Sequence, residues 1–159
     1  MKIIAKSAVF VLFVFIFGSC ATEPIEDTPN IEAANITVLE QDVLQLVNSH
    51  RRELGVSALA FSNVAYEYAN KHTDYMIAQG SLSHDNFSAR ASSIASKVEV
   101  QMVAENVAKD YKTAQEAFNG WYKSTNHKKT MEGDFTHSAV SVKEDANGNL
   151  YFTQLFYKE

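Results

Sequence analysis

The feature that most constrains this chain of 159 residues is its single cysteine, which stands at the end of an apolar run near the amino terminus. One cysteine cannot form an internal disulfide, so an exported domain built from this chain has to fold on its hydrophobic core alone. Apolar residues make up 46% of the chain and charged residues 21%. That composition is ordinary for a globular domain, and it excludes a disordered or collagen-like chain.

The amino terminus is typical of an exported lipoprotein. Lys2 and Lys6 precede an apolar run over residues 8–17, and Gly18 and Ser19 then lead to Cys20. Such a run is too short to cross a bilayer, which needs about 20 residues, whereas basic residues before a short apolar stretch indicate a secretory signal peptide. Small residues before a single cysteine resemble a bacterial lipobox, in which the signal is removed and the thiol is lipidated. We therefore expect residues 1–19 to be the signal peptide and Cys20 to be the lipidation site, the alternative being an uncleaved anchor with an incidental cysteine.

Residues 20–36 are predicted to be the lipidated cysteine followed by an acidic flexible tether. The segment holds both prolines of the chain and lacks lysine and arginine, and it has too little apolar surface to order itself. Loss of Lys2 and Lys6 leaves 12 basic against 19 acidic residues, a net charge of −7. This charge excludes a nucleic-acid partner and leaves the acyl chains to hold the protein at the membrane. We expect a lipid-anchored protein of the cell envelope, in the outer membrane of a Gram-negative source because Ala21 rather than Asp follows the cysteine, with the membrane face left open.

Residues 37–159 are predicted to form one α+β domain. A 3.6-residue apolar period predicts a helix over 37–54, and Ser62 and Gly80 bracket a second one reaching residue 79. A short helix is expected over 89–96, and the capping box Thr113-Ala-Gln-Glu116 opens another that carries Trp121 into the core. Residues 135–142 and 150–157 are rich in β-branched and aromatic side chains around the turn signal 145–149, which predicts an antiparallel hairpin.

Three polar residues are the main candidates for chemistry. His84 lies in a loop of small and polar residues, Glu105 interrupts an apolar run, and His127 follows the last long helix. The helical histidines His50 and His72 are interpreted as packing or surface residues. Imidazole and carboxylate groups that converge in a pocket bind zinc or act as acid and base, but spacing alone does not establish convergence.

Five motifs, taken together, resemble the CAP superfamily, also called SCP-like, whose members include cysteine-rich secretory proteins, antigen 5 and plant pathogenesis-related proteins. The resemblance covers about residues 40–159, and the motifs occur in the family's order. They are Leu46-Val-Asn-Ser-His-Arg51 leading to Gly55, Ser83-His84 followed by Phe87 and Arg90, Ala104-Glu-Asn-Val-Ala108, Trp121-Tyr-Lys-Ser-Thr-Asn-His127 and Tyr151-Phe-Thr-Gln-Leu-Phe156.

The resemblance implies an α-β-α sandwich, with a central antiparallel sheet flanked by helices and a further strand near residues 98–107. It also implies a cleft in which two histidines and two acids meet, of which His84 and Glu105 match the first of each kind. Eukaryotic members have their second acid where this chain has Ser124, and their second histidine where it has Asp134. We hypothesise that His127 and Asp134 restore the set of two histidines and two acids with their positions exchanged. The hypothetical ligands for zinc or calcium are then His84, His127, Glu105 and Asp134, and Ser83, Asn106 and Ser124 are expected to line the cleft.

Two classes of function are weighed, and a binding module is favoured. Its cleft would hold a small apolar ligand, a glycan or a protein partner, with metal binding left open. The alternative is a metal-assisted hydrolase or protease with His84, Glu105 and His127 as catalytic residues and Glu105 as the base. Against it, the only cysteine is assigned to lipidation and Ser83 has no identified orienting acid. A third interpretation is that His84, Glu105 and Asn106 form a hydrogen-bond network that only orders the loops.

Overall fold

The computed structural model describes residues 33–159. The predicted signal peptide, the predicted lipidation site Cys20 and the greater part of the predicted tether lie outside the described residues. The first helix begins at Thr37, where the domain was expected to start. The described part contains the helices α1 (Thr37–Glu53), α2 (Asn63–Gln79), α3 (Phe87–Ala95), α4 (Ala114–Lys123) and α5 (Thr125–Glu132), and the strands β1 (Ala60–Phe61), β2 (Met102–Lys109), β3 (His137–Glu144) and β4 (Leu150–Lys158).

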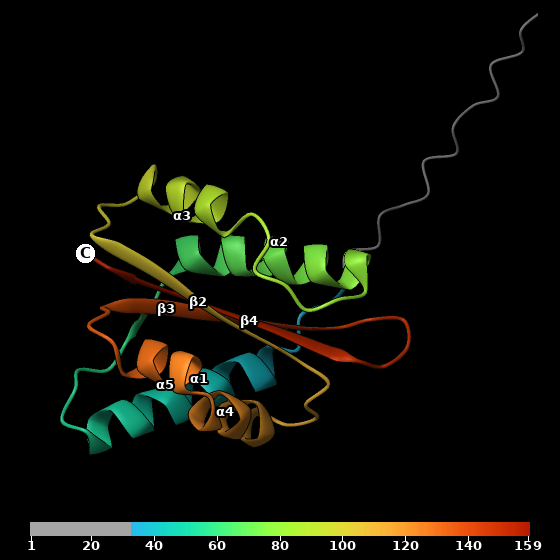
Figure 1. Cartoon of the computed structure of the whole chain (residues 1–159), viewed down its shortest axis with the longest axis horizontal. Helices are drawn as coiled ribbons and strands as arrows, with labels where there is room; N and C mark the ends of the chain where they lie inside the picture. Colours follow the sequence, from blue (N-terminus) through green and yellow to red (C-terminus); the bar gives the residue numbers. More distant parts are fainter. Residues whose placement is uncertain (1–32) are drawn as a thin grey trace, which may run out of the picture. The chain divides into compact units, whose positions relative to one another are not determined.

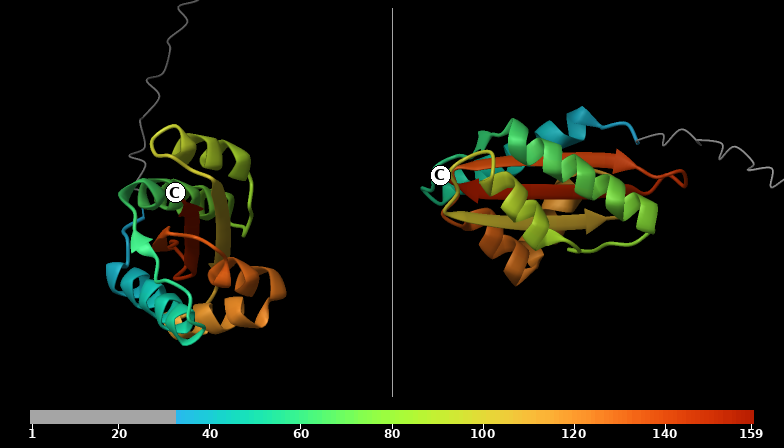
Figure 2. Two further views of the ribbon diagram at one scale, coloured as in Figure 1. Left: turned by 90° about the vertical axis from the view of Figure 1, so that its left-hand side faces the viewer. Right: turned by 90° about the horizontal axis from the view of Figure 1, so that it is seen from above.

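A four-stranded sheet with the order β1-β3-β4-β2 lies between two layers of helices. Figures 1 and 2 show α2 and α3 on one face of the sheet and α1, α4 and α5 on the other. The predicted α+β sandwich is confirmed. Strands β2, β4 and β3 are antiparallel, but β1 pairs in parallel with β3, so the sheet is mixed. This two-residue strand lies where the chain passes from α1 to α2, and it is too short to give an alternation in the sequence.

The predicted helix boundaries follow their capping residues. The Ser62 hydroxyl accepts a hydrogen bond from the Ala65 amide at the start of α2, and Gly80 ends that helix with φ 66°. Thr113 caps α4 by accepting from the Glu116 amide at 3.1 Å. The Glu116 carboxylate reaches back to the amide of Lys112, one residue before the cap.

Strand β4 is buried along almost its whole length because it has a strand on each side and a helical layer on each face. This explains why its apolar and aromatic residues stand in two consecutive runs, 150–152 and 155–157, rather than in alternation, with the buried polar residues Thr153 and Gln154 between them. The hairpin turn forms at the predicted residues, where the Asp145 carboxylate accepts from the amides of Asn147 and Asn149. Trp121 is 1% exposed in the core, as expected. No helix within residues 33–159 is both long and apolar enough to cross a membrane.

Candidate functional site

The centre of the site is the carboxylate of Glu105, whose side chain is 1% exposed on the face of β2 covered by α2 and α3. Arg90 of α3 binds both carboxylate oxygens, with its Nε 2.9 Å from Oε2 and its Nη2 2.8 Å from Oε1. A buried carboxylate needs such a partner, and a bidentate guanidinium is the strongest that a protein offers. Arg90 also donates to the carbonyl of Asp85, so α3 and the loop before it are fastened to β2 at this point.

His84 shares this carboxylate from the loop between α2 and α3. Its Nδ1 lies 2.9 Å from Glu105 Oε1, and its side chain is 52% exposed. Because a carboxylate only accepts, Nδ1 carries the proton and Nε2 is left facing outward. In the neutral ring this outward nitrogen is a hydrogen-bond acceptor that is held in a fixed orientation by a buried anion.

His72 lies beneath the same loop on α2. Its Nε2 is 2.8 Å from the Ser83 carbonyl and therefore donates to it, and it is 3.7 Å from Glu105 Oε1. Its Nδ1 is buried without a hydrogen-bond partner among the described residues. Burial lowers the pKa of His72, an effect that the charge of Glu105 opposes. His72 is thus buried, in agreement with its interpretation as a packing residue. It has a further role, because its hydrogen bond to Ser83 holds the loop that carries His84.

The lowered pKa of His72 predicts a loss of stability in mild acid. A histidine whose pKa is depressed in the folded state binds fewer protons there than in the unfolded chain, so its contribution is complete above about pH 6.5 and is lost as the pH falls through the folded-state pKa. The free energy of unfolding, measured with urea at neutral and mildly acidic pH, should fall in the wild type and fall less in His72→Gln. Equal pH dependence in the two proteins would contradict this assignment.

His127, on α5, is half-buried and is not among the residues that line the cavity beside His84 and Glu105. Burial and then the charge of His84 lower its pKa. Its main-chain carbonyl accepts a hydrogen bond from the side-chain Nδ2 of Asn106, which is fully buried on the opposite face of β2 from Glu105. Asn106 therefore fastens α5 to the sheet rather than lining the cleft. Ser83 and Ser124 are half-buried, the first in the His84 loop and the second at the start of α5.

The hollow at this site measures about 270 Å³ and lies along β2 between α3 and α5. Its lining residues are His84, Phe87, Val103, Ala104, Glu105 and Thr130. Arg90, His72 and Thr130 were not among the predicted site residues. The sequence did contain a signal for Arg90. A carboxylate inside an apolar strand requires a cation, and Arg90 belongs to the same sequence motif as His84.

The predicted metal-ligand set is not assembled in the described part of the chain. Within residues 33–159, no three side chains of His, Cys, Asp or Glu are grouped to hold a metal ion. The Asp134 side chain is 79% exposed and pairs with Lys158. Arg90 already neutralises Glu105 and occupies both of its oxygens. The residues therefore do not fit a divalent ion held on Glu105, and His84 and Glu105 are joined to each other by a hydrogen bond instead.

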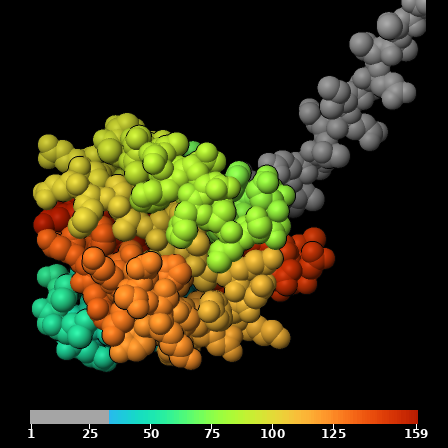
Figure 3. Space-filling view, in the orientation of Figure 1, coloured from blue at the N-terminus to red at the C-terminus, as the bar shows by residue number. Residues whose placement is uncertain are grey.

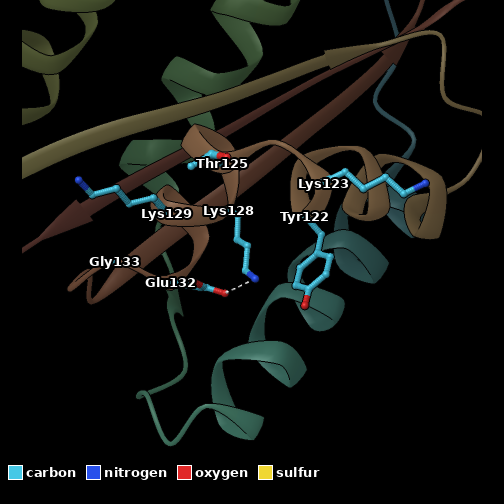
Figure 4. Close-up of a pocket in the computed structure, with 7 residues that line it drawn as sticks. All are labelled: Tyr122, Lys123, Thr125, Lys128, Lys129, Glu132 and Gly133. Atoms are coloured by element: carbon cyan, nitrogen blue, oxygen red, sulfur yellow. Dashed lines mark ion pairs between the residues drawn. The ribbon is translucent and has the colours of Figure 1, made fainter.

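Larger hollows lie elsewhere on residues 33–159. One, of about 640 Å³, is lined by α4 and α5 and is basic. In Figure 4, Lys128 points between Tyr122 and Glu132, whereas Lys123 and Lys129 project to opposite sides, so the three lysines do not converge on one anion. Another, of about 590 Å³, lies along α1, where Leu44, Phe61 and Tyr66 supply apolar lining.

Comparisons with known proteins identify relatives of this domain. The model of the CAP (cysteine-rich secretory protein) family matches residues 44–156. Two proteins of Bacillus subtilis (strain 168) are similar: the uncharacterized membrane protein YlbC, 30% identical over 128 residues and 77% of this chain, and the uncharacterized protein YkwD, 23% identical over 142 residues and 87% of this chain. The aligned regions span only 35% and 54% of the lengths of these relatives.

Solved structures have the same fold. An extracellular protein containing an SCP domain from Bacillus anthracis is 25% identical with a TM-score of 0.69, over 77% of this chain and 41% of that one. An outer surface protein of Borrelia burgdorferi gives a TM-score of 0.69 at 16% identity, over 80% of this chain and 98% of its own. A cysteine-rich secretory protein of Staphylococcus aureus gives a TM-score of 0.66 at 15% identity, over 86% of this chain and 40% of that one.

Proposed function

Since this chain belongs to the CAP (cysteine-rich secretory protein) family, we propose that it is a non-enzymatic binding module of the cell envelope. The binding site is the hollow along β2 between His84 and Thr130. Its ligand is a partner molecule outside the cytoplasm, a class that includes peptides, glycans and small apolar compounds.

One observation carries this proposal, namely the engagement of Glu105 by Arg90 and His84. Both oxygens of this carboxylate are already engaged by the guanidinium and the imidazole, and its side chain is 1% exposed, so a water molecule has little access to it. It does hold His84 rigidly at the rim of the hollow. The arrangement supports a preorganised recognition surface, with an oriented imidazole and the apolar side chains of Phe87 and Val103 beside it.

The envelope location rests on the amino terminus and on the relatives. Residues 1–19 have the pattern of an export signal, and Cys20 stands where a lipobox would place the lipidated residue. One similar protein is named as a membrane protein and another as extracellular. A diacyl anchor at Cys20, followed by the acidic segment, would present the domain at a distance from the membrane surface.

His84→Ala is expected to reduce ligand binding at least about tenfold while leaving the protein folded, because the ring is half exposed and its loss removes an oriented hydrogen-bonding group. The measurement uses the full chain in detergent micelles on arrays of random peptides and of cell-wall glycans. His137→Ala is the matched control, since that ring stacks on Tyr157 away from the hollow. Equal binding by His84→Ala and the wild type would refute this site.

A hydrolase is the second candidate, and the His84–Glu105 pair is the observation that favours it. A carboxylate that fixes the Nδ1 proton of histidine leaves Nε2 placed to accept a proton from water. Incubation of the same peptide and glycan libraries with the protein, with and without chelator, should give no turnover. Turnover that is lost in both His84→Ala and Glu105→Gln would overturn the preference for binding.

A further inference from the structure

The main-chain groups along the outer edge of β2 follow from its pairing with β4. β2 is the last strand of the sheet, and in its antiparallel register Asp110 donates to the carbonyl of Leu150. Hydrogen-bonded pairs alternate along an antiparallel ladder, so the residues an even number of positions from Asp110 bond to β4. The amides and carbonyls of Val103, Glu105 and Val107 therefore point away from β4, toward the open edge.

In residues 33–159, Val103 and Glu105 have no neighbouring strand or side chain with which their outward main-chain groups pair. The Val107 carbonyl accepts a hydrogen bond from the indole of Trp121 at 3.0 Å, which confirms the direction of these groups. Within residues 33–159, no hydrogen bond is found to the outward amide and carbonyl of Val103 or of Glu105. Glu105 is 8% exposed as a residue although its side chain is only 1% exposed, so what solvent reaches is mostly its main chain.

This unpaired edge forms the floor of the hollow described above. His84 and Phe87 line it from the α3 side, and Thr130 lines it from α5. In Figure 1, β2 passes between α3 and α5, and the space-filling view from the same side (Figure 3) shows the residues of α3 and β2 bordering those of α5. Free main-chain groups and side-chain lining are thus combined in one groove.

We propose that this groove binds an extended peptide segment of a partner protein, which adds to the sheet as a fifth strand along Val103–Glu105. The segment would exchange main-chain hydrogen bonds with the outward groups of Val103 and Glu105. One of its side chains would enter the hollow beside Phe87, and His84 Nε2 would accept a hydrogen bond from it. This inference rests on the proposed function and narrows its ligand to a peptide.

The arrangement favours a peptide in trans over the other occupants. Glycans and small apolar molecules lack the alternating donors and acceptors that match a strand edge. In a second copy of this chain, β2 is likewise flanked by α3 and α5. The helices of the two copies would therefore meet before their β2 edges could pair. The amino-terminal segment of the same chain joins the described domain near Asn35, which bridges Lys143 of β3 rather than β2.

The test selects binders from a phage-displayed library of random heptapeptides, using the full chain in detergent micelles. The strongest binder is then synthesised with one backbone amide N-methylated at a time. Strand addition predicts that methylation at alternate positions weakens binding at least about tenfold, while the intervening positions, which point away from β2, tolerate it. Uniform tolerance of N-methylation, or a loss without the two-residue period, would overturn the proposal.

A second test changes the protein instead of the peptide. Val103→Pro removes an outward amide but no hydrogen bond to β4, and proline is tolerated on edge strands. Val103→Ala is the matched control, because it truncates the same side chain and keeps the amide. We expect Val103→Pro to lose at least about tenfold more affinity for the selected peptide than Val103→Ala. A circular dichroism spectrum unlike that of the wild type would instead exclude the variant, leaving the N-methyl series to decide.

The outcomes separate this inference from the proposed function. Glycan binding that depends on His84, together with an absence of peptide binders, would refute strand addition and keep the binding module. Peptide binding that survives Val103→Pro but is lost in His84→Ala would also refute strand addition and keep the binding module. Failure of both libraries to yield any His84-dependent ligand would refute both proposals.

Discussion

Arg90→Met is expected to lower the free energy of unfolding by about 3–5 kcal/mol, because it leaves the carboxylate of Glu105 buried without its cation. The methionine fills much of the same volume, so the loss reports the unpaired charge rather than a cavity. Urea unfolding at neutral pH provides the measurement. The carbonyl of Asp85 also loses a donor, which adds to the effect.

The double variant Arg90→Met/Glu105→Gln separates the ion pair from packing. Replacing both members removes the buried charge, so we expect the double variant to be more stable than Arg90→Met alone. A double variant that is less stable than Arg90→Met would show that the two side chains contribute independently, and would contradict the ion pair as the fastening between α3 and β2.

Arg51→Met should be comparably destabilising, by at least about 3 kcal/mol, since several buried carbonyls would lose their donor together. Arg51 is 1% exposed, and its guanidinium donates to the carbonyls of Ser57, Met131, Gly133 and Phe135. Burial lowers the pKa of Arg51, which the charge of Asp134 opposes. This one side chain ties α1 to the segment between α5 and β3.

The neighbouring Arg52 offers the control for this prediction. It is exposed, and its side chain donates a hydrogen bond to the Ser49 hydroxyl. Arg52→Met should change the urea midpoint little, because single surface substitutions usually stay within about 0.5 kcal/mol. Similar losses in the two variants would show that the carbonyl contacts of Arg51 contribute little to stability.

Local sequence signals predicted most of the fold. Ser62, Gly80 and Thr113 cap helices where they were expected to, because caps depend on the hydrogen bonds of only a few neighbouring residues. Strand β2 was placed only through the family resemblance. Its residues face a helical layer on each side of the sheet, so they give no polar alternation, and the polar Glu105 and Asn106 interrupt the apolar run.

The site was less predictable because it depends on contacts between distant residues. The sequence indicated that Glu105 needed a partner, but the choice of Arg90 depends on how α3 packs over β2. His72 could be placed on a helix, whereas its contact with the His84 loop required the tertiary structure. Asp134 and His127 were matched by position in motifs, and position does not fix the direction in which a side chain points.

The central claim is that the groove along β2 is where this protein binds its partner. The most direct measurement is a ¹H–¹⁵N NMR titration of the full chain in detergent micelles with the tightest ligand found in the peptide and glycan libraries. We predict chemical-shift changes centred on the amides of Val103 and Glu105 and on the ring of His84. Changes confined to the basic hollow of α4 and α5, or to the apolar hollow along α1, would contradict the claim.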